Sequence, residues 1–164
     1  MKKRIGIMLL LAMLLSLCAP ALAEATDGTK HAITSASFPA YMENALDIVG
    51  PMKLIAAHMG GWGCWHEAKE LLSETGIFID TAFSMGMMTP AADQHKWKIE
   101  DLQLLNKEAF CELVQAFGAK KVLFGTDSPW AEPEQELRKI RDLPLAKEDI
   151  FMILGENAKL LLSV

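Results

Sequence analysis

The hydrophobic pattern of this chain contains three short apolar runs that each lead to a residue able to bind metal or move a proton. The runs cover residues 54–57, 77–79 and 122–124, and the reactive residues that follow them are His58, Asp80 and Asp127. Short continuous apolar runs bounded by turn residues are typical of parallel strands buried on both faces. The pattern therefore predicts three such strands, with a reactive group at the carboxyl end of each.

Around these runs, apolar residues recur at helical spacing. The predicted helices cover residues 38–49, 65–74, 99–117, 133–141 and 147–154, and a last turn or two follows Gly155. Strands that alternate with helices are typical of an α/β fold with a parallel sheet.

The spacing of the reactive residues favours a TIM-type (β/α) barrel. In such a barrel of about 250 residues, each strand and helix pair takes roughly 31 residues, and the active site gathers at the carboxyl ends of the strands. Positions 58 and 127 are 69 residues apart, which fits two such units with the run before Asp80 as the middle strand. We therefore expect an α/β fold, a partial TIM-type barrel of about three parallel strands with flanking helices. Leu160–Leu162 are expected to close the barrel floor.

Four segments carry a more specific resemblance. They are His58-Met-Gly-Gly61, Phe78-Ile-Asp-Thr81, Phe124-Gly-Thr-Asp-Ser-Pro-Trp130 and Gly155-Glu-Asn-Ala-Lys-Leu-Leu-Leu162. In order and spacing they resemble the C-terminal half of the amidohydrolase-related metal-dependent hydrolases, a family that also contains decarboxylases of aromatic and related acids. The resemblance covers residues 38–164 and implies that the three strands are the sixth, seventh and eighth of the barrel.

The resemblance also implies roles for the residues at the strand ends. It makes Asp127 a metal ligand and a catalytic residue together with His58, whose imidazole would orient or deprotonate the attacking water or protonate a substrate carbon. Asp80 would fix the orientation of a ligand from outside the metal's own shell. Trp62 and Trp130 are candidates for substrate contact. Carboxylate and imidazole donors suit several divalent ions, among which we expect zinc, with manganese as the alternative.

Each of these residues also has a purely structural interpretation. An Asp between Gly-Thr and Ser-Pro can cap a turn through backbone N–H groups. His58 can be a buried histidine whose hydrogen bonds are satisfied, and Asp80 can be a structural acceptor. Trp62 and Trp130 can pack at the barrel's rim as readily as they can contact a substrate.

The sequence also lacks part of the family's pattern. No segment matches the His-x-His pair that family members carry on the first strand, and His31, the one histidine before His58, does not follow an apolar run. Three parallel strands cannot close into a barrel, so two strand edges would be exposed. We therefore expect a small-molecule substrate and, as partner, a complementary half-barrel chain or a second copy of this chain.

The N-terminus predicts a signal peptide over residues 1–23. Basic residues at 2–4 precede an apolar core at 5–17 that is short for a membrane span, and small residues lead to a cleavage site after Ala23. We expect export to the periplasm or the extracellular space, a flexible linker at 24–37 and the half-barrel at 38–164. Membrane attachment is expected only if the signal peptide stays uncleaved. Losing three basic residues would change the formal charge from −5 to −8, which argues against a nucleic-acid partner.

Two classes of function follow from this pattern. The first is a metal-dependent hydrolase of C–N or C–O bonds, or a non-oxidative decarboxylase, that needs a missing N-terminal half. The second is a catalytically inactive exported remnant or interaction module that keeps the fold without the activity.

Overall fold

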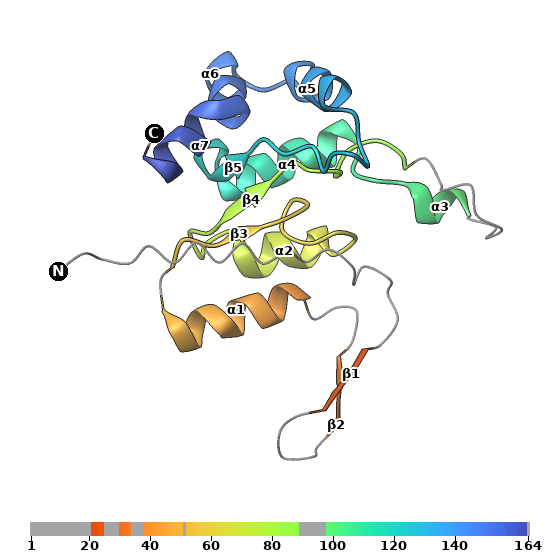
Figure 1. Cartoon of the computed structure of the whole chain (residues 1–164), viewed down its shortest axis with the longest axis vertical. Helices are drawn as coiled ribbons and strands as arrows, with labels where there is room; N and C mark the ends of the chain where they lie inside the picture. The colour runs from red at the N-terminus through yellow and green to blue at the C-terminus, as the bar shows by residue number, and fades with distance from the viewer. Residues whose placement is uncertain (1–20, 25–29, 34–37, 51, 89–97, 164) are drawn as a thin grey trace.

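The computed structural model describes residues 21–24, 30–33, 38–50, 52–88 and 98–163, and Figure 1 shows their arrangement. The elements, in chain order, are β1 (Ala21–Glu24), β2 (Lys30–Ile33), α1 (Phe38–Val49), β3 (Ile55–Ala56), α2 (Trp65–Leu72), β4 (Phe78–Asp80), α3 (Ile99–Leu102), α4 (Lys107–Phe117), the 3₁₀ turn η2 (Ala119–Lys121), β5 (Val122–Leu123), α5 (Pro133–Arg141), α6 (Lys147–Phe151), the π-helix η3 (Met152–Glu156) and α7 (Asn157–Leu162).

Near the N-terminus, β1 and β2 pair as antiparallel strands, with Ala21 opposite Ile33. Most of the expected signal peptide, residues 1–20, lies outside the described residues, and the expected cleavage site after Ala23 falls within β1. Strand β2 occupies part of the segment expected to be a linker. Among the helices of the described ranges, none is long and apolar enough to cross a membrane.

The main sheet consists of β3, β4 and β5, which are parallel and lie in that order. In this register Ala56 pairs with Ile79, and Asp80 pairs with Leu123. The three strands therefore end at the same edge of the sheet, as the sequence predicted. The expected α/β fold with three parallel strands and flanking helices is confirmed.

Helices α2 and α4 cover one face of this sheet and form the core with it (Figure 1). Gly60 shows how tightly the layers meet. A Cβ added there would lie 2.9 Å from Ala68 Cβ of α2, 3.6 Å from Ile79 of β4 and 3.8 Å from Phe117 of α4. With a φ of +92° as well, this position accepts only glycine without displacing its neighbours.

The helix expected over residues 99–117 is two helices, because the chain between them bonds to another segment. The N–H group of Leu105 donates to the carbonyl of Ser84 (3.1 Å), and that of Gly86 donates to the carbonyl of Leu105 (3.0 Å). Asn106 then caps α4 by accepting from the N–H group of Ala109 (2.8 Å). Leu105 is buried without being helical, so the apolar pattern runs through the break.

The expectation that Leu160–Leu162 close a barrel floor is wrong for this structure. Leu160 is 70% exposed and Leu162 is 54% exposed. Gly155 does not interrupt the helix either, because it lies within η3, and the wider π-helical turn changes which side chains face inward. Ile153 and Asn157 are the buried residues here instead.

Asn157 joins the C-terminal helices to the start of β5. Its Nδ2 group donates to the carbonyl oxygens of Ala119 and Val122, each at 2.7 Å. The side chain is 2% exposed, so water cannot replace these bonds if they are lost.

We predict that Asn157→Ala lowers the free energy of unfolding by about 2–3 kcal/mol, because it removes the donor to two carbonyl groups in a buried setting. Denaturant unfolding measures the change. Asn44→Ala, at an exposed position of α1, is the matched control and should change stability by less than about 0.5 kcal/mol. Equal losses in the two variants would contradict this role of Asn157.

Candidate functional site

The backbone is strained where β3 and β5 lead into their loops. His58 and Met59 have φ values of 56° and 55°, and Asp127 has a φ of 55°. Such left-handed conformations are uncommon for residues other than glycine and cost about 1–3 kcal/mol each. Two contacts hold them in place, because Trp65 Nε1 donates to the His58 carbonyl (2.9 Å) and the Trp130 N–H group donates to the Asp127 carbonyl (2.8 Å).

The Asp80 carboxylate links the ends of β3 and β4. Its Oδ1 accepts from the backbone N–H groups of His58 (3.0 Å) and Ala82 (3.1 Å). Burial raises the pKa of this carboxyl above its usual value, and the negative charge of Asp127 raises it further, while the hydrogen bonds and His58 act in the opposite direction. Asp80 therefore holds the backbone of His58 and Ala82, and its role in orienting a metal ligand stays a prediction.

The His58 imidazole is oriented by the next loop. Its Nδ1 lies 2.9 Å from the carbonyl oxygen of Ala82. A carbonyl only accepts, so we assign the ring proton to Nδ1, which leaves the lone pair of Nε2 available. Within the described part of the chain, no hydrogen bond engages Nε2. A neutral imidazole in this state can accept a proton or bind a metal.

The Asp127 carboxylate is half-buried, and within the described ranges it makes no hydrogen bond or ion pair. The turn after it is closed by the backbone, through the bond from Trp130 N–H to the Asp127 carbonyl, and not by the side chain. Capping of the turn by the carboxylate, the structural alternative, is therefore not what the structure shows. The carboxylate is left to act as an acceptor or as a metal ligand.

The ends of β4 and β5 are clipped together by one hydroxyl group. Thr81 Oγ1 donates to the carbonyl of Gly125 and accepts from the N–H group of Gly125, each at 3.1 Å. A Cβ at position 125 would lie 3.1 Å from Ala82 Cβ and 3.5 Å from Asp80 Cγ. Glycine at this position therefore lets β5 approach the Asp80 carboxyl closely.

The aromatic residues near the strand ends have different surroundings. Trp62 is half-buried, and its ring lies 6.4 Å from the ring of Phe83. Trp130 is 70% exposed. Packing is thus observed for Trp62, and contact of either tryptophan with a substrate stays a prediction.

Two residues that bond the loop after β4 were not predicted from the sequence. Ser84 is fully buried, and its hydroxyl donates to the Ala82 carbonyl (2.7 Å). Lys139 of α5 donates to the carbonyl of Met85 (2.9 Å) and pairs with the buried Glu136 (2.6 Å). The signal available in the sequence was the pair of short hydroxyl residues, Thr81 and Ser84, directly after the strand-ending Asp80.

A metal would find a partial set of ligands here. Burial is the main reason that the pKa of Asp80 is raised, and the nearby charge of Asp127 adds to it, so a cation at this edge would offset both carboxylate charges. Yet within the described residues, no three His, Cys, Asp or Glu side chains group so as to hold a metal ion. Asp127 is the metal ligand that the resemblance implies among the described residues, whereas a usual zinc site has three or four protein ligands. The described residues therefore fit part of a divalent-metal site and do not complete one.

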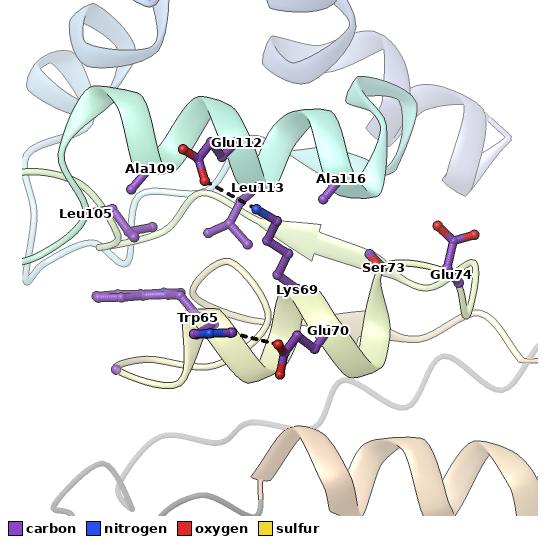
Figure 2. Close-up of a pocket in the computed structure, with 12 residues that line it drawn as sticks. Trp65, Lys69, Glu70, Ser73, Glu74, Leu105, Ala109, Glu112, Leu113 and Ala116 are labelled. Atoms are coloured by element: carbon purple, nitrogen blue, oxygen red, sulfur yellow. Dashed lines mark hydrogen bonds and ion pairs between the residues drawn. The ribbon is translucent and has the colours of Figure 1, made fainter.

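A groove of about 780 Å³ lies elsewhere, between α2 and α4 (Figure 2). Its walls carry an ion pair between Lys69 and Glu112 (3.2 Å), and His66 Nδ1 lies 3.4 Å from Glu70 Oε1. These side chains are largely exposed, so the pairs add little stability. None of the predicted site residues lines this groove, which is therefore separate from the candidate site.

We predict that Asp80→Asn stabilises the fold at neutral pH and flattens its pH dependence. In the wild type, Asp80 ionises at a higher pH in the native state than in the unfolded state. As the pH rises between these two pKa values, the unfolded state holds fewer protons, so the free energy of unfolding falls, and the loss is complete above the native pKa. Asparagine keeps the acceptor oxygen for both N–H groups without the charge.

Denaturant unfolding between about pH 4 and pH 8 in the presence of a chelator measures this difference. Asp80→Ala, which removes the acceptor as well, should be less stable than Asp80→Asn throughout. Parallel pH profiles for the wild type and Asp80→Asn would contradict the cost of burying this charge.

Solved structures share this fold over part of their length. A dihydroxybenzoic acid decarboxylase from Polaromonas sp. JS666, with bound manganese and the inhibitor 2-nitroresorcinol, aligns with a TM-score of 0.54 and 14% identity over 79% of this chain and 40% of its own. A TIM-barrel protein from Bordetella bronchiseptica aligns with a TM-score of 0.56 and 18% identity over 76% and 39%. An amidohydrolase from Burkholderia multivorans with bound zinc aligns with a TM-score of 0.57 and 13% identity over 80% and 51%.

At these identities the likeness shows the fold alone, and the fold is that of part of a TIM barrel. The chain spans between about two fifths and one half of the length of these three proteins. No curated protein matches it significantly. The amidohydrolase family model matches residues 10–164, so the chain belongs to the amidohydrolase family, as its motifs predicted.

Proposed function

We propose that this chain supplies part of the active site of a metal-dependent amidohydrolase-family enzyme, which hydrolyses a C–N or C–O bond or removes CO₂ non-oxidatively from a small acid. One observation carries the proposal. Three adjacent parallel strands bring His58, Asp80 and Asp127 to one edge of the sheet. Carboxyl ends of barrel strands are where such enzymes place their reacting groups.

In this proposal Asp127 is a ligand of a divalent metal. Its carboxylate is half-buried, makes no hydrogen bond or ion pair within the described ranges, and lies close enough to Asp80 to raise the pKa of that residue. The manganese of the Polaromonas structure and the zinc of the Burkholderia structure support a divalent ion without choosing between them. Such an ion supplies a Lewis acid, which makes water a stronger nucleophile at neutral pH or polarises a carboxyl group.

His58 moves the proton. In hydrolysis, Nε2 accepts a proton from the attacking water and later returns it to the leaving nitrogen or oxygen. In decarboxylation, the protonated ring gives its Nε2 proton to the carbon that loses CO₂. Asp80 fixes the His58 backbone, and Trp62 and Trp130 contact the substrate at the rim.

The remaining metal ligands come from outside the described residues. We propose that a complementary half-barrel or a second copy of this chain supplies them, since about three fifths of the Polaromonas enzyme has no counterpart here. The alternative is a folded, catalytically inactive protein, and the short set of donors in the described ranges favours it.

We also propose that residues 1–23 direct export and are then removed. N-terminal sequencing of the protein recovered from the producing cells tests this. A first residue of Glu24 would support the proposal, whereas an intact Met1 on the exported protein would contradict it.

We predict that the full chain retains Zn²⁺ or Mn²⁺ after dialysis and that Asp127→Asn weakens this binding by at least about tenfold, because it removes the charged ligand. Metal content by plasma mass spectrometry and a competition titration measure it. Asp142→Asn, at an exposed position that follows α5, is the matched control and should bind as the wild type does.

Equal retention by Asp127→Asn would show that Asp127 is not the ligand. A folded wild type that retains no metal above background would contradict metal binding by this chain alone, because the site would then need its missing ligands or would not exist. Retention that only Asp127→Asn loses would justify a substrate screen among small amides, esters and aromatic acids.

A further inference from the structure

Two donors share the carbonyl oxygen that faces His58. The Ala82 oxygen lies 2.9 Å from His58 Nδ1, and the Ser84 hydroxyl donates to the same oxygen at 2.7 Å. Ser84 is 0% exposed, so the hydroxyl has no competing water at its surface. A buried hydroxyl in this position contributes mainly to where the carbonyl points.

The turn between these residues brings the hydroxyl to the carbonyl. Phe83 has a φ of 47°, a conformation that an aromatic residue rarely adopts, and it reverses the chain between Ala82 and Ser84. The Ser84 side chain can then bond the residue two positions before it. The Phe83 ring lies 6.4 Å from the Trp62 ring, and the Ser84 hydroxyl is the group in the turn that donates to the Ala82 carbonyl.

The rest of the loop is anchored on both sides of the turn. On one side, the Ala82 N–H group donates to Asp80 Oδ1 (3.1 Å). On the other, the Ser84 carbonyl accepts from Leu105 N–H (3.1 Å), and the Met85 carbonyl accepts from Lys139 Nζ (2.9 Å). The Ala82 carbonyl is thus the group whose direction depends on the Ser84 hydroxyl.

We propose that Ser84 is a positioning residue that fixes the tautomer of His58. By holding the Ala82 carbonyl toward Nδ1, it keeps the ring proton on Nδ1 and the lone pair on Nε2. Free histidine prefers the opposite tautomer, so the protein imposes this one. The use made of Nε2 rests on the proposed function, whereas the tautomer is a property of the chain without metal or substrate.

Nitrogen-15 NMR of the full chain, with labelled histidine and a chelator present, tests the proposal at about pH 8.5, where a free imidazole is neutral. The spectrum separates a protonated ring nitrogen from one with a lone pair, and His58→Gln identifies the His58 signals. We expect Nδ1 to be protonated in at least about nine tenths of the wild-type molecules. In Ser84→Ala the ratio of molecules protonated at Nδ1 to molecules protonated at Nε2 should fall by about fivefold. The loss of one ordinary hydrogen bond predicts a change of this size.

Two controls separate this role from a general effect on folding. Thr75→Ala removes a hydroxyl that also donates to a backbone carbonyl, that of Leu72 (2.6 Å), and it should leave the His58 tautomer unchanged. Ser84→Cys keeps a weak donor of similar size and should give an intermediate ratio. The His66 signals should be the same in every variant.

Protonation of Nε2 in the wild type would overturn the proposal, and so would a folded Ser84→Ala that keeps the wild-type ratio. If Ser84→Ala does not fold, Ser84→Cys decides in the same way. Because no metal is present, failure of the chain to bind metal leaves this result intact, and the two proposals can fail separately.

Discussion

One carboxylate oxygen joins the two loops on which the candidate site depends. Asp80 Oδ1 accepts the backbone N–H group of His58 from the loop after β3 and that of Ala82 from the loop after β4. Partial burial of the same side chain raises its pKa, and the nearby charge of Asp127 raises it further. The carboxylate that orders the two loops therefore carries a negative charge whose partial burial costs stability. Such a cost is typical of sites whose arrangement serves chemistry more than stability.

The positions around Asp80 show the same balance between strain and support. His58, Phe83 and Asp127 adopt left-handed conformations. Trp65 bonds the His58 carbonyl, and backbone groups hold the turns that contain the other two. The supporting contacts come from α2, α5 and the segment before α4, which are elements that pack around the sheet. The core thus determines where His58 Nε2 and the Asp127 carboxylate lie, although neither atom is part of that core.

The sequence predicted the sheet better than it predicted the support of the site. Apolar runs identify β3, β4 and β5, because a strand buried on both faces needs a continuous run of apolar residues. The sequence did not predict the break between α3 and α4. Leu105 is apolar and buried like a helical core residue, but its backbone bonds to Ser84 and Gly86 instead of continuing a helix. Ser84 was missed because its role comes from the φ of Phe83, which no residue type at that position signals. The exposure of Leu160 followed from the π-helix η3, whose wider turn the sequence does not reveal.

The place where a metal ion binds on the chain shows whether the three strand ends form a cation site. In a titration of the isotope-labelled full chain with Mn²⁺, the paramagnetic ion broadens the amide signals nearest to it. We predict that broadening begins at residues 58–61, 80–82 and 125–128, the three strand ends. Broadening that begins instead along the groove between α2 and α4, near Glu70 and Glu112, would contradict the claim that these strand ends form the cation site.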